Sequence, residues 1–141
     1  MSPESYSASL TRDPISTEEA SRWLQDSTCG AIHLFCGVVR DLNREQTVTR
    51  IEYHSHEPLA LKSLEKIVAG LVESGATKAI AIHRLGMLEV GETSILLGVS
   101  LPHRKRGFEL LERGMLEIKS EVAVWKHEHY TDSPPEWIEG S

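Results

Sequence analysis

Cysteine is scarce in this sequence: Cys29 and Cys36 are the only two among 141 residues, and they do not form a CxxC pair. A disulfide framework or a cysteine zinc site is therefore not expected. No apolar run approaches about 20 residues, the length of a membrane-spanning helix. The stretch 1–14 carries Glu4 and lacks the apolar segment of a signal peptide. These absences predict a cytoplasmic protein with no membrane segment.

An excess of positive charge is also missing. The chain has 15 Lys and Arg residues against 21 Asp and Glu residues, which gives a formal net charge of -6. Broad nucleic-acid binding needs a basic surface that displaces counterions, so no nucleic-acid partner is expected. The GxSxG motif of serine hydrolases, the phosphate loop GxxxxGK and the Rossmann motif GxGxxG are absent as well.

What is present is a mixture of helical and strand patterns. Ser16, with Glu19 three residues later, forms a capping box that opens a short helix. Pro58 and Gly75 bracket a second helical stretch. A third helix is expected over 104–121. Its core stripe is expected to consist of Phe108, Leu111, Met115 and Ile118.

Strands are expected where β-branched and other apolar residues gather or alternate. These stretches are 30–40, 47–56, 77–86, 93–101 and 122–130. The stretch 93–101 is apolar on both faces and is expected to be the central strand. The intervening stretches 41–46 and 87–92 are expected to be a polar loop and a turn-bearing link.

The order of these elements shows no internal repeat and no regular strand–helix alternation, which predicts the α+β class. A length of 141 residues suits one domain. We therefore expect a loose N-terminal segment over 1–14, followed by a single domain over 15–141.

Lys119 is the first candidate for chemistry, because it lies near the apolar stripe of its predicted helix. On a helical wheel it falls about 20° from Phe108 and about 40° from Met115. It is either a lysine whose stem packs while its ammonium reaches water, or a partly desolvated group that serves as a nucleophile or acid/base.

Lys126 shares a predicted strand face with Val122 and Val124 in the segment VAVWKHEHY. It either lies at a strand end beyond the buried part, or is held close to Lys119. Like charges held close together favour a neutral amine, a condition that catalysis uses. The sequence leaves both readings open.

The basic stretch HRKR at 103–106 follows a predicted strand and opens a predicted helix. A helix N-terminus attracts anions and is a poor place for cations. His103 and Arg104 therefore indicate either a bound anion such as phosphate or a solvated basic turn. Arg40, at the end of the apolar run FCGVVR, either clamps an anion or pairs with Asp41.

Two pairs of histidines have i, i+2 spacing: His54 with His56, and His127 with His129. Each pair points to one side of a strand and is a possible metal pair. No third ligand has a recognisable spacing, so no metal site is expected.

Six segments occur in the order and with the spacings of one protein family. They are GAIHLFCGVVRDLN, IEYHSHEPLA, IHRLGMLEVGE, SLPHRKRGFE, LEIKSEVAVWKHE and the late Trp137. On these segments the chain resembles the large, catalytic subunit of molybdopterin synthase, the MoaE family. The resemblance covers Gly30 to Trp137. It implies a fold of the α/β-hammerhead type, with a mixed and mainly antiparallel sheet and flanking helices.

The resemblance also implies an activity. Such subunits are sulfurtransferases that bind a small ubiquitin-like sulfur carrier, MoaD-like, whose C-terminal Gly-Gly ends in a thiocarboxylate. They place two sulfurs on cyclic pyranopterin monophosphate and so make the dithiolene of molybdopterin. The implied assembly is a homodimer with one carrier at each end, a heterotetramer. Neither a cofactor nor a metal is implied for the sulfur transfer.

The family's functional positions correspond to five residues of this sequence. Its catalytic lysines match Lys119 and Lys126, and its anion-binding positions match Arg40, His103 and Arg104. The resemblance implies that the last three hold the substrate phosphate, in part across a dimer interface. Lys119 is implied to meet the carrier's C-terminus, and Lys126 to transfer protons or orient the substrate.

Two other classes of function stay open at this point. One is a docking module that binds a ubiquitin-like carrier without turnover. The other is a phosphate-binding hydrolase on a similar scaffold, for which a nucleophile motif and a metal set are missing. The two lysines favour the enzyme over the docking module.

Overall fold

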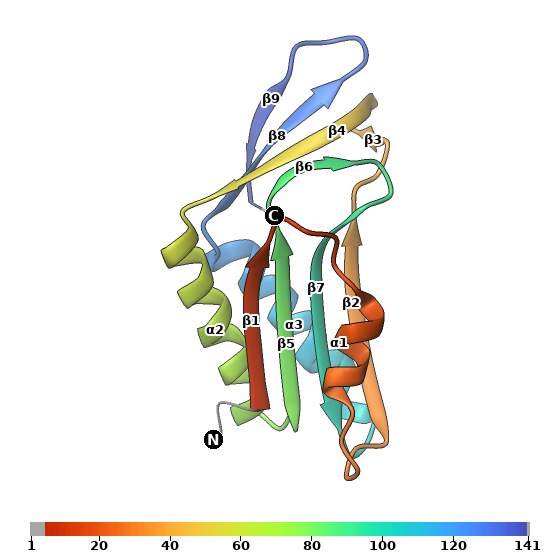
Figure 1. The fold of residues 1–141 in the computed structure, drawn as a ribbon, viewed down its shortest axis with the longest axis vertical. Helices are drawn as coiled ribbons and strands as arrows, with labels where there is room; N and C mark the ends of the chain where they lie inside the picture. The colour runs from red at the N-terminus through yellow and green to blue at the C-terminus, as the bar shows by residue number, and fades with distance from the viewer. Residues whose placement is uncertain (1–4, 141) are drawn as a thin grey trace.

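The computed structural model describes residues 5–140, which form two β-sheets and three helices (Figure 1). The helices are α1 (Thr17–Leu24), α2 (Glu57–Glu73) and α3 (Lys105–Glu121). The strands are β1 (Tyr6–Thr11), β2 (Ala31–Val38), β3 (Leu42–Asn43), β4 (Gln46–Ser55), β5 (Lys78–Arg84), β6 (Gly86–Glu89), β7 (Thr93–Leu101), β8 (Val124–Tyr130) and β9 (Glu136–Glu139). None of the helices in this part of the chain is long and apolar enough to cross a membrane. The mixture confirms the predicted α+β class.

Four strands form the first sheet, in the order β1-β5-β7-β2. β1 runs parallel to β5, and the other neighbours are antiparallel. α2 and α3 cover one face of this sheet, and α1 lies on the other face (Figure 1). β7 lies inside the sheet and is buried from Ser94 to Leu101, which confirms that 93–101 is a central strand.

The second sheet lies across one end of the first (Figure 1). β4 pairs with β8 along one edge and with β3 and β6 along the other, and β8 also pairs with β9. Along β8, Val124 and Glu128 are buried, whereas Trp125 is exposed. This alternation is expected because successive side chains of a strand point to opposite faces. Lys126 therefore points inward, toward the first sheet.

The signals for helix starts and ends are confirmed. The Ser16 hydroxyl accepts the Glu19 N–H at 3.1 Å and caps α1. Pro58 lies in the first turn of α2, where its missing N–H costs no helical hydrogen bond. Gly75 follows α2 with a φ of +128°, a conformation that glycine adopts without steric cost.

The predicted core stripe of α3 is wrong in part. The buried residues of this helix are Gly107, Leu110, Gly114 and Ile118. Phe108 is instead 67% exposed, and Leu111 and Met115 are only partly buried beside the core. The helix is thus rotated so that its larger apolar side chains lie at the margin of the core.

Two glycines explain this rotation. A Cβ added at Gly107 would lie 2.2 Å from His33 Nε2, and one added at Gly114 would lie 2.7 Å from Leu97 Cδ2. Both distances are far below van der Waals contact, so only glycine permits this approach of helix to sheet. The spacing of large apolar side chains along the sequence does not reveal a packing face that contains glycines in their place.

The expectation of a loose segment over 1–14 is wrong for Tyr6–Thr11, which form β1, while residues 1–4 lie outside the described part. β1 is an edge strand that pairs with β5. Tyr6, Ala8 and Leu10 pack against the core on one face of it. Its partner is distant in the chain and it has few β-branched residues, so the local sequence does not reveal it.

Three short strands fall mainly in stretches for which no strand is predicted. β3, β6 and β9 each contain two to four residues. They form because β4 and β8 offer open edges for backbone hydrogen bonds. Strands of this length are too short to show a period of their own in the sequence.

Candidate active site

A cavity of about 230 Å³ lies where the end of β2, the last turns of α3 and the inner face of the second sheet meet. The polar and charged side chains in its wall are Arg40, Asn43, Tyr53, Ser94, Lys119, Lys126 and Glu128. Phe35, Ile51 and Met115 are among its apolar wall residues. Three cations against one carboxylate give the wall a net positive charge, which suits an anionic ligand.

Lys119 reaches this cavity from the last turn of α3. A cation in that turn is stabilised by the negative end of the helix dipole. Met115, one turn earlier on the same helix face, also lines the cavity. The residue is exposed, so its ammonium is open to a group that approaches from outside the chain.

Lys126 reaches the same cavity from β8, where it lies opposite Tyr53 of β4. Its side chain is 22% exposed, and its Nζ lies 3.6 Å from Glu128 Oε2. Lys126 thus belongs to the paired part of the strand rather than to a solvated end. Lys119 and Lys126 therefore line the same cavity.

Glu128 is a site residue that the sequence analysis misses. It is 2% exposed, and its Oε1 accepts hydrogen bonds from Asn43 Nδ2 at 2.7 Å and from the Tyr130 hydroxyl at 3.0 Å. A signal was available, because residues 126 and 128 share a strand face. A carboxylate on a buried face needs partners, and the nearby lysine is the obvious one.

Two phenols near Glu128 stay protonated at neutral pH. Burial raises the pKa of Tyr53; the Ser94 hydroxyl lowers this pKa, and the charge of Glu128 raises it further. Desolvation, together with the hydrogen bond to Glu128, raises the pKa of Tyr130 to about 12. The Tyr130 hydroxyl therefore acts as a donor to the carboxylate.

Arg40 follows β2 and also lines the cavity. Its backbone neighbourhood is fixed, because the Val39 N–H donates to the Glu92 carbonyl at 2.9 Å and the Val39 carbonyl accepts from the Gly91 N–H at 2.7 Å. The Arg40 residue itself is exposed. Its guanidinium is therefore available to an anion that enters the cavity.

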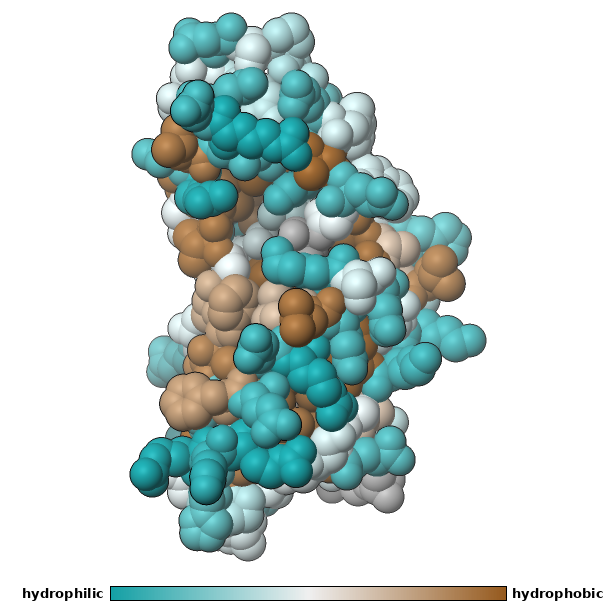
Figure 2. Space-filling model, turned by 180° about the vertical axis from the view of Figure 1, so that it is seen from behind, coloured by the Kyte–Doolittle hydropathy of each residue, from teal (hydrophilic) through white to brown (hydrophobic). Residues whose placement is uncertain are grey.

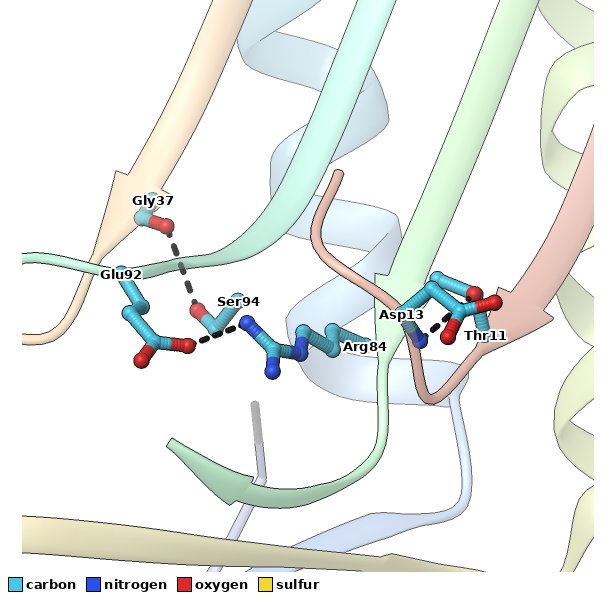
Figure 3. A network of polar contacts seen from close by, with 6 residues as sticks. All are labelled: Thr11, Asp13, Gly37, Arg84, Glu92 and Ser94. Atoms are coloured by element: carbon cyan, nitrogen blue, oxygen red, sulfur yellow. Dashed lines mark hydrogen bonds and ion pairs between the residues drawn. The ribbon is translucent and has the colours of Figure 1, made fainter. Parts of the chain in front are cut away.

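The wall beside Arg40 depends on close contact between β2 and β7. Gly37 permits this contact, since an added Cβ would lie 2.6 Å from Ile95 Cγ2. Figure 3 shows the Ser94 hydroxyl reaching the Gly37 carbonyl, at 3.3 Å, close to the ion pair of Arg84 with Glu92. These polar contacts hold the ends of the strands that form the cavity rim.

His103 and Arg104 lie elsewhere. Both are exposed, and Arg104 is the N-cap residue of α3, about 22 Å along the helix from Lys119. The start of α3 lies near the beginning of β2, whereas Arg40 follows the end of that strand. One chain therefore brings the two lysines together with Arg40 and leaves His103 and Arg104 outside the cavity.

Histidines of the second sheet contact neighbouring side chains of that sheet. His127 stacks on Trp137 with ring centroids 4.3 Å apart and an angle of 3° between the planes. His54 Nε2 lies 3.1 Å from a Glu52 carboxylate oxygen. In residues 5–140 no group of three or more His, Cys, Asp or Glu side chains is placed to hold a metal ion. The stacking on Trp137 helps to fasten β9 to β8.

Comparison with known proteins identifies the family. The MoaE protein family matches residues 10–121. The molybdopterin synthase catalytic subunit of Bacillus subtilis (strain 168) is 37% identical over 131 residues, which cover 92% of this chain and 82% of the relative. The crystal structure of molybdopterin synthase from Staphylococcus aureus superposes with a TM-score of 0.85 at 30% identity, over 91% of this chain and 93% of that chain.

A further structure shares the fold at lower identity. It is the protein–protein complex of subunits 1 and 2 of the molybdopterin-converting factor from Helicobacter pylori 26695, with a TM-score of 0.75 at 21% identity, over 94% of this chain and 88% of that chain. The family match spans most of the chain, and the Bacillus subtilis relative is covered over most of its length. This chain therefore belongs to the MoaE family, the family of molybdopterin synthase catalytic subunits.

Proposed function

We propose that this chain transfers sulfur from the thiocarboxylate of a small ubiquitin-like carrier to cyclic pyranopterin monophosphate. Its family membership makes it an enzyme subunit with a role in molybdenum cofactor biosynthesis. The proposal adds the sulfur donor, the sulfur acceptor and the roles of individual residues.

One observation supports this proposal most strongly: Lys119 of α3, Lys126 of β8 and Arg40, which follows β2, line one cavity. Convergent cations suit an acceptor that carries a phosphate and a carrier tail that ends in an anion. The cavity, of about 230 Å³, is smaller than the roughly 300–1,000 Å³ of typical ligand pockets. It therefore suits part of the acceptor and leaves the rest to groups from outside the chain.

In the proposed reaction the carrier's C-terminus meets Lys119. The thiocarboxylate sulfur forms a bond to a carbon of the pterin side chain and displaces an oxygen substituent from that carbon, and the Lys119 ammonium stabilises the charge that develops. Water then cleaves the bond between this sulfur and the carrier's acyl carbon, so that the sulfur stays on the pterin and the carrier leaves as a carboxylate. Lys126, held beside Glu128, transfers protons or orients the acceptor. Arg40 binds the phosphate of the acceptor.

An apolar patch adjoins the cavity and is proposed to bind a second copy of the chain. We call it the α3 patch; its residues are Phe35, Phe108, Leu111, Met115 and Leu116. Phe108 is 67% exposed and Leu116 is 63% exposed, and apolar side chains gather on this side of the molecule (Figure 2). Exposed apolar patches of this kind mark interaction surfaces. The patch shares Lys119 with the cavity.

The spacing of residues on α3 supports a second copy as the occupant. Residues 104, 108, 111, 115 and 119 lie on one helix face, at steps of three or four. When two copies pack this face antiparallel about a two-fold axis, Phe108 of one copy lies opposite Met115 of the other. By the same register, Arg104 of one copy lies opposite Lys119 of the other. The basic residues that one chain leaves outside its own cavity then complete the cavity of the second copy.

The carrier tail is proposed to enter at the C-terminal end of α3. A second hollow, of about 460 Å³, is lined by Lys119, Trp125 and Glu139 together with the segment 122–124. Because it shares Lys119 with the cavity, an extended tail lying in it reaches that ammonium. Trp125 and Trp137 are exposed beside this path and offer an aromatic surface to the carrier body. The Helicobacter pylori protein of the same fold assembles with a second subunit, and a small partner is proposed here as well.

Reconstitution tests the proposal. The wild-type protein is mixed with thiocarboxylated carrier and cyclic pyranopterin monophosphate, and the dithiolene product is followed by mass spectrometry. We expect product that depends on all three components. A carrier that ends in an ordinary carboxylate is the matched control, because it lacks only the sulfur. Carrier binding without any product would contradict the proposal and would leave a docking module.

A further inference from the structure

Glu128 is a buried carboxylate to which the proposed reaction assigns no step. It is 2% exposed and contacts Lys126 through one oxygen, and Asn43 and Tyr130 through the other. We infer that Asn43 and Tyr130 are positioning residues for sulfur transfer, acting on Lys126 through the Glu128 carboxylate. The inference rests on the proposed function of Lys126.

The two oxygens of the Glu128 carboxylate have different partners. Oε1 accepts from Asn43 Nδ2 at 2.7 Å and from the Tyr130 hydroxyl at 3.0 Å. Oε2 is the oxygen that lies 3.6 Å from Lys126 Nζ. Two donors on one oxygen fix the rotation of the carboxylate group, so the second oxygen keeps one direction. The Lys126 ammonium is thereby drawn toward one place in the cavity wall.

Asn43 is positioned by a tight hairpin turn between β3 and β4. Asn43 pairs with Gln46 across the turn residues Arg44 and Glu45, whose φ angles are 51° and 66°. Two left-handed residues are what a two-residue hairpin turn of this type requires, and glycine or asparagine usually supplies them. Neither turn residue is glycine here. Strained backbone persists where the surroundings fix it and gathers at functional sites, and this turn places Asn43 on Glu128.

The Tyr130 hydroxyl is the second donor to the Glu128 carboxylate. Its hydroxyl donates to Glu128 Oε1 and lies 3.4 Å from Glu136 Oε2, so two carboxylates compete for one proton. The shorter contact is to the buried carboxylate. The raised pKa of about 12 keeps the phenol protonated, so it acts as a donor throughout the physiological range.

A purely structural role for this network makes a different prediction. A buried carboxylate is costly to desolvate, and a glutamine at position 128 can keep both hydrogen bonds on one oxygen. Lys126 is 22% exposed, so its ammonium keeps access to water when the charge of Glu128 is removed. Glu128→Gln keeps the shape and one acceptor oxygen, but removes the charge that attracts Lys126. We therefore expect Glu128→Gln to keep its unfolding midpoint while its turnover falls. If the network served only to stabilise the fold, Glu128→Gln would lower the unfolding midpoint and leave turnover unchanged.

The test is a double-mutant cycle in the reconstituted system with carrier and pterin substrate. Steady-state rates are measured for Glu128→Gln, Asn43→Ala and Tyr130→Phe, and for each of the latter two combined with Glu128→Gln. We expect kcat to fall about 100-fold for Glu128→Gln and about tenfold for each of the others, with KM changed less than about twofold. In the Glu128→Gln background the second substitution should have no further effect on kcat.

Thr49→Val is the matched control, because the Thr49 hydroxyl of β4 donates to the His129 carbonyl of β8 at 3.2 Å within the same sheet. It should leave kcat unchanged. Multiplying effects in the double variants, or a kcat unchanged in Tyr130→Phe, would overturn the inference. Tyr130→Phe removes only a hydroxyl, so it decides the case even where Asn43→Ala unfolds. An inactive wild-type protein would instead refute the proposed function, which keeps the two failures distinct.

Discussion

At the scale of single residues, the two lysines of the site are held in different ways. Lys126 has a buried carboxylate beside it, 3.6 Å away. Lys119 is exposed in the last turn of a helix. This difference fits a division of roles, because a group that meets an incoming carrier tail has to be accessible, whereas a group that acts on a bound acceptor has to be fixed.

Replacing Lys119 with alanine tests its role. We expect Lys119→Ala to abolish turnover, while the free energy of unfolding changes by less than about 0.5 kcal/mol, as for other exposed positions. Single-turnover product formation and urea unfolding measure the two quantities. Lys66→Ala, at an exposed lysine of α2, is the control and should keep full activity. Wild-type rates in Lys119→Ala would remove this residue from the mechanism.

His83 gives a prediction about pH and stability. Burial lowers the pKa of His83 to about 4 from 6.5, against the opposing effect of its hydrogen bond to the Arg84 carbonyl. Because the folded pKa lies below the unfolded one, the unfolded chain takes up the proton first as the pH falls. The stability that neutral His83 contributes is therefore complete above about pH 6.5 and is lost between about pH 6.5 and 4.

Urea unfolding between pH 7 and 4 measures this loss. We expect a contribution of about 3 kcal/mol from this histidine, so His83→Leu should flatten the pH dependence by that amount. His103→Leu, at an exposed histidine, should leave the pH dependence as it is. Parallel curves for the wild type and His83→Leu would contradict the prediction, because they would show that His83 has the same pKa in the folded and unfolded states.

At the scale of elements, glycines determine how α3 lies on the sheet and therefore where Lys119 points. Gly107 and Gly114 lie on the buried face with Leu110 and Ile118, and this orientation turns Phe108 outward into the α3 patch. A helix rotated to bury Phe108 would move residues 115 and 119 away from their present positions in the cavity wall. The packing of one helix face thus positions Lys119 and also exposes the proposed dimer surface.

Gly114→Ala tests this packing. The added methyl favours the helix by about 1 kcal/mol, but it would lie 2.7 Å from Leu97 and 3.0 Å from Leu71, and overpacking of a core costs about 1–3 kcal/mol. We expect a net loss of stability of about 1 kcal/mol in chemical unfolding. Gly70→Ala is the matched control in α2, because its methyl would meet only Arg113 Nη2 at 3.6 Å.

The control should gain stability, by up to about 1 kcal/mol. An equal gain in both variants would mean that the two helices have similar room at these glycines. The comparison isolates packing, since both substitutions have the same effect on helix propensity.

The long elements could be predicted from the sequence because their signals are local. Ser16 with Glu19, Pro58 and Gly75 act within a few residues of where they stand. β1, β6 and β9 could not be predicted, because each exists only through a partner strand far away in the chain. The rotation of α3 was missed for a related reason, since it depends on the residues that two glycines meet.

The site was predicted in part. Charge and periodicity indicated Lys119, Lys126 and Arg40, and all three line one cavity. Glu128 was missed although it lies two residues from Lys126 on the same strand face. Its importance comes from burial and from Asn43, which a hairpin turn brings from a remote part of the chain. Whether His103 and Arg104 act at this cavity is a question of assembly, which a single sequence does not answer.

At the scale of the whole molecule, the five basic residues predicted for the site lie in two separate groups. Arg40 and the two lysines lie at the end where the sheets meet, and His103 and Arg104 lie at the start of α3. The α3 patch runs between these ends on the surface. Two-fold packing through the patch unites both groups, so the proposed dimer explains in one step the exposed apolar residues and the separated cations.

Leu116→Asp tests the dimer. A carboxylate in the centre of an apolar interface is costly to desolvate, so we expect the variant to sediment as a monomer in analytical ultracentrifugation. Leu59→Asp is the matched control, because Leu59 is 53% exposed on α2, away from the patch. A wild-type protein that sediments as a monomer with bound carrier would contradict the proposed assembly.

Subunit mixing tests most directly whether Arg104 of one copy serves the cavity that contains Lys119 of the other. Arg104→Ala and Lys119→Ala chains are refolded together in equal amounts, and product formation is measured at a substrate concentration well below KM. A mixed dimer contains one cavity with both residues intact, so we expect about one quarter of the wild-type activity, although each variant alone is nearly inactive. Activity no greater than the average of the two variants would show that the cavity is not shared between copies.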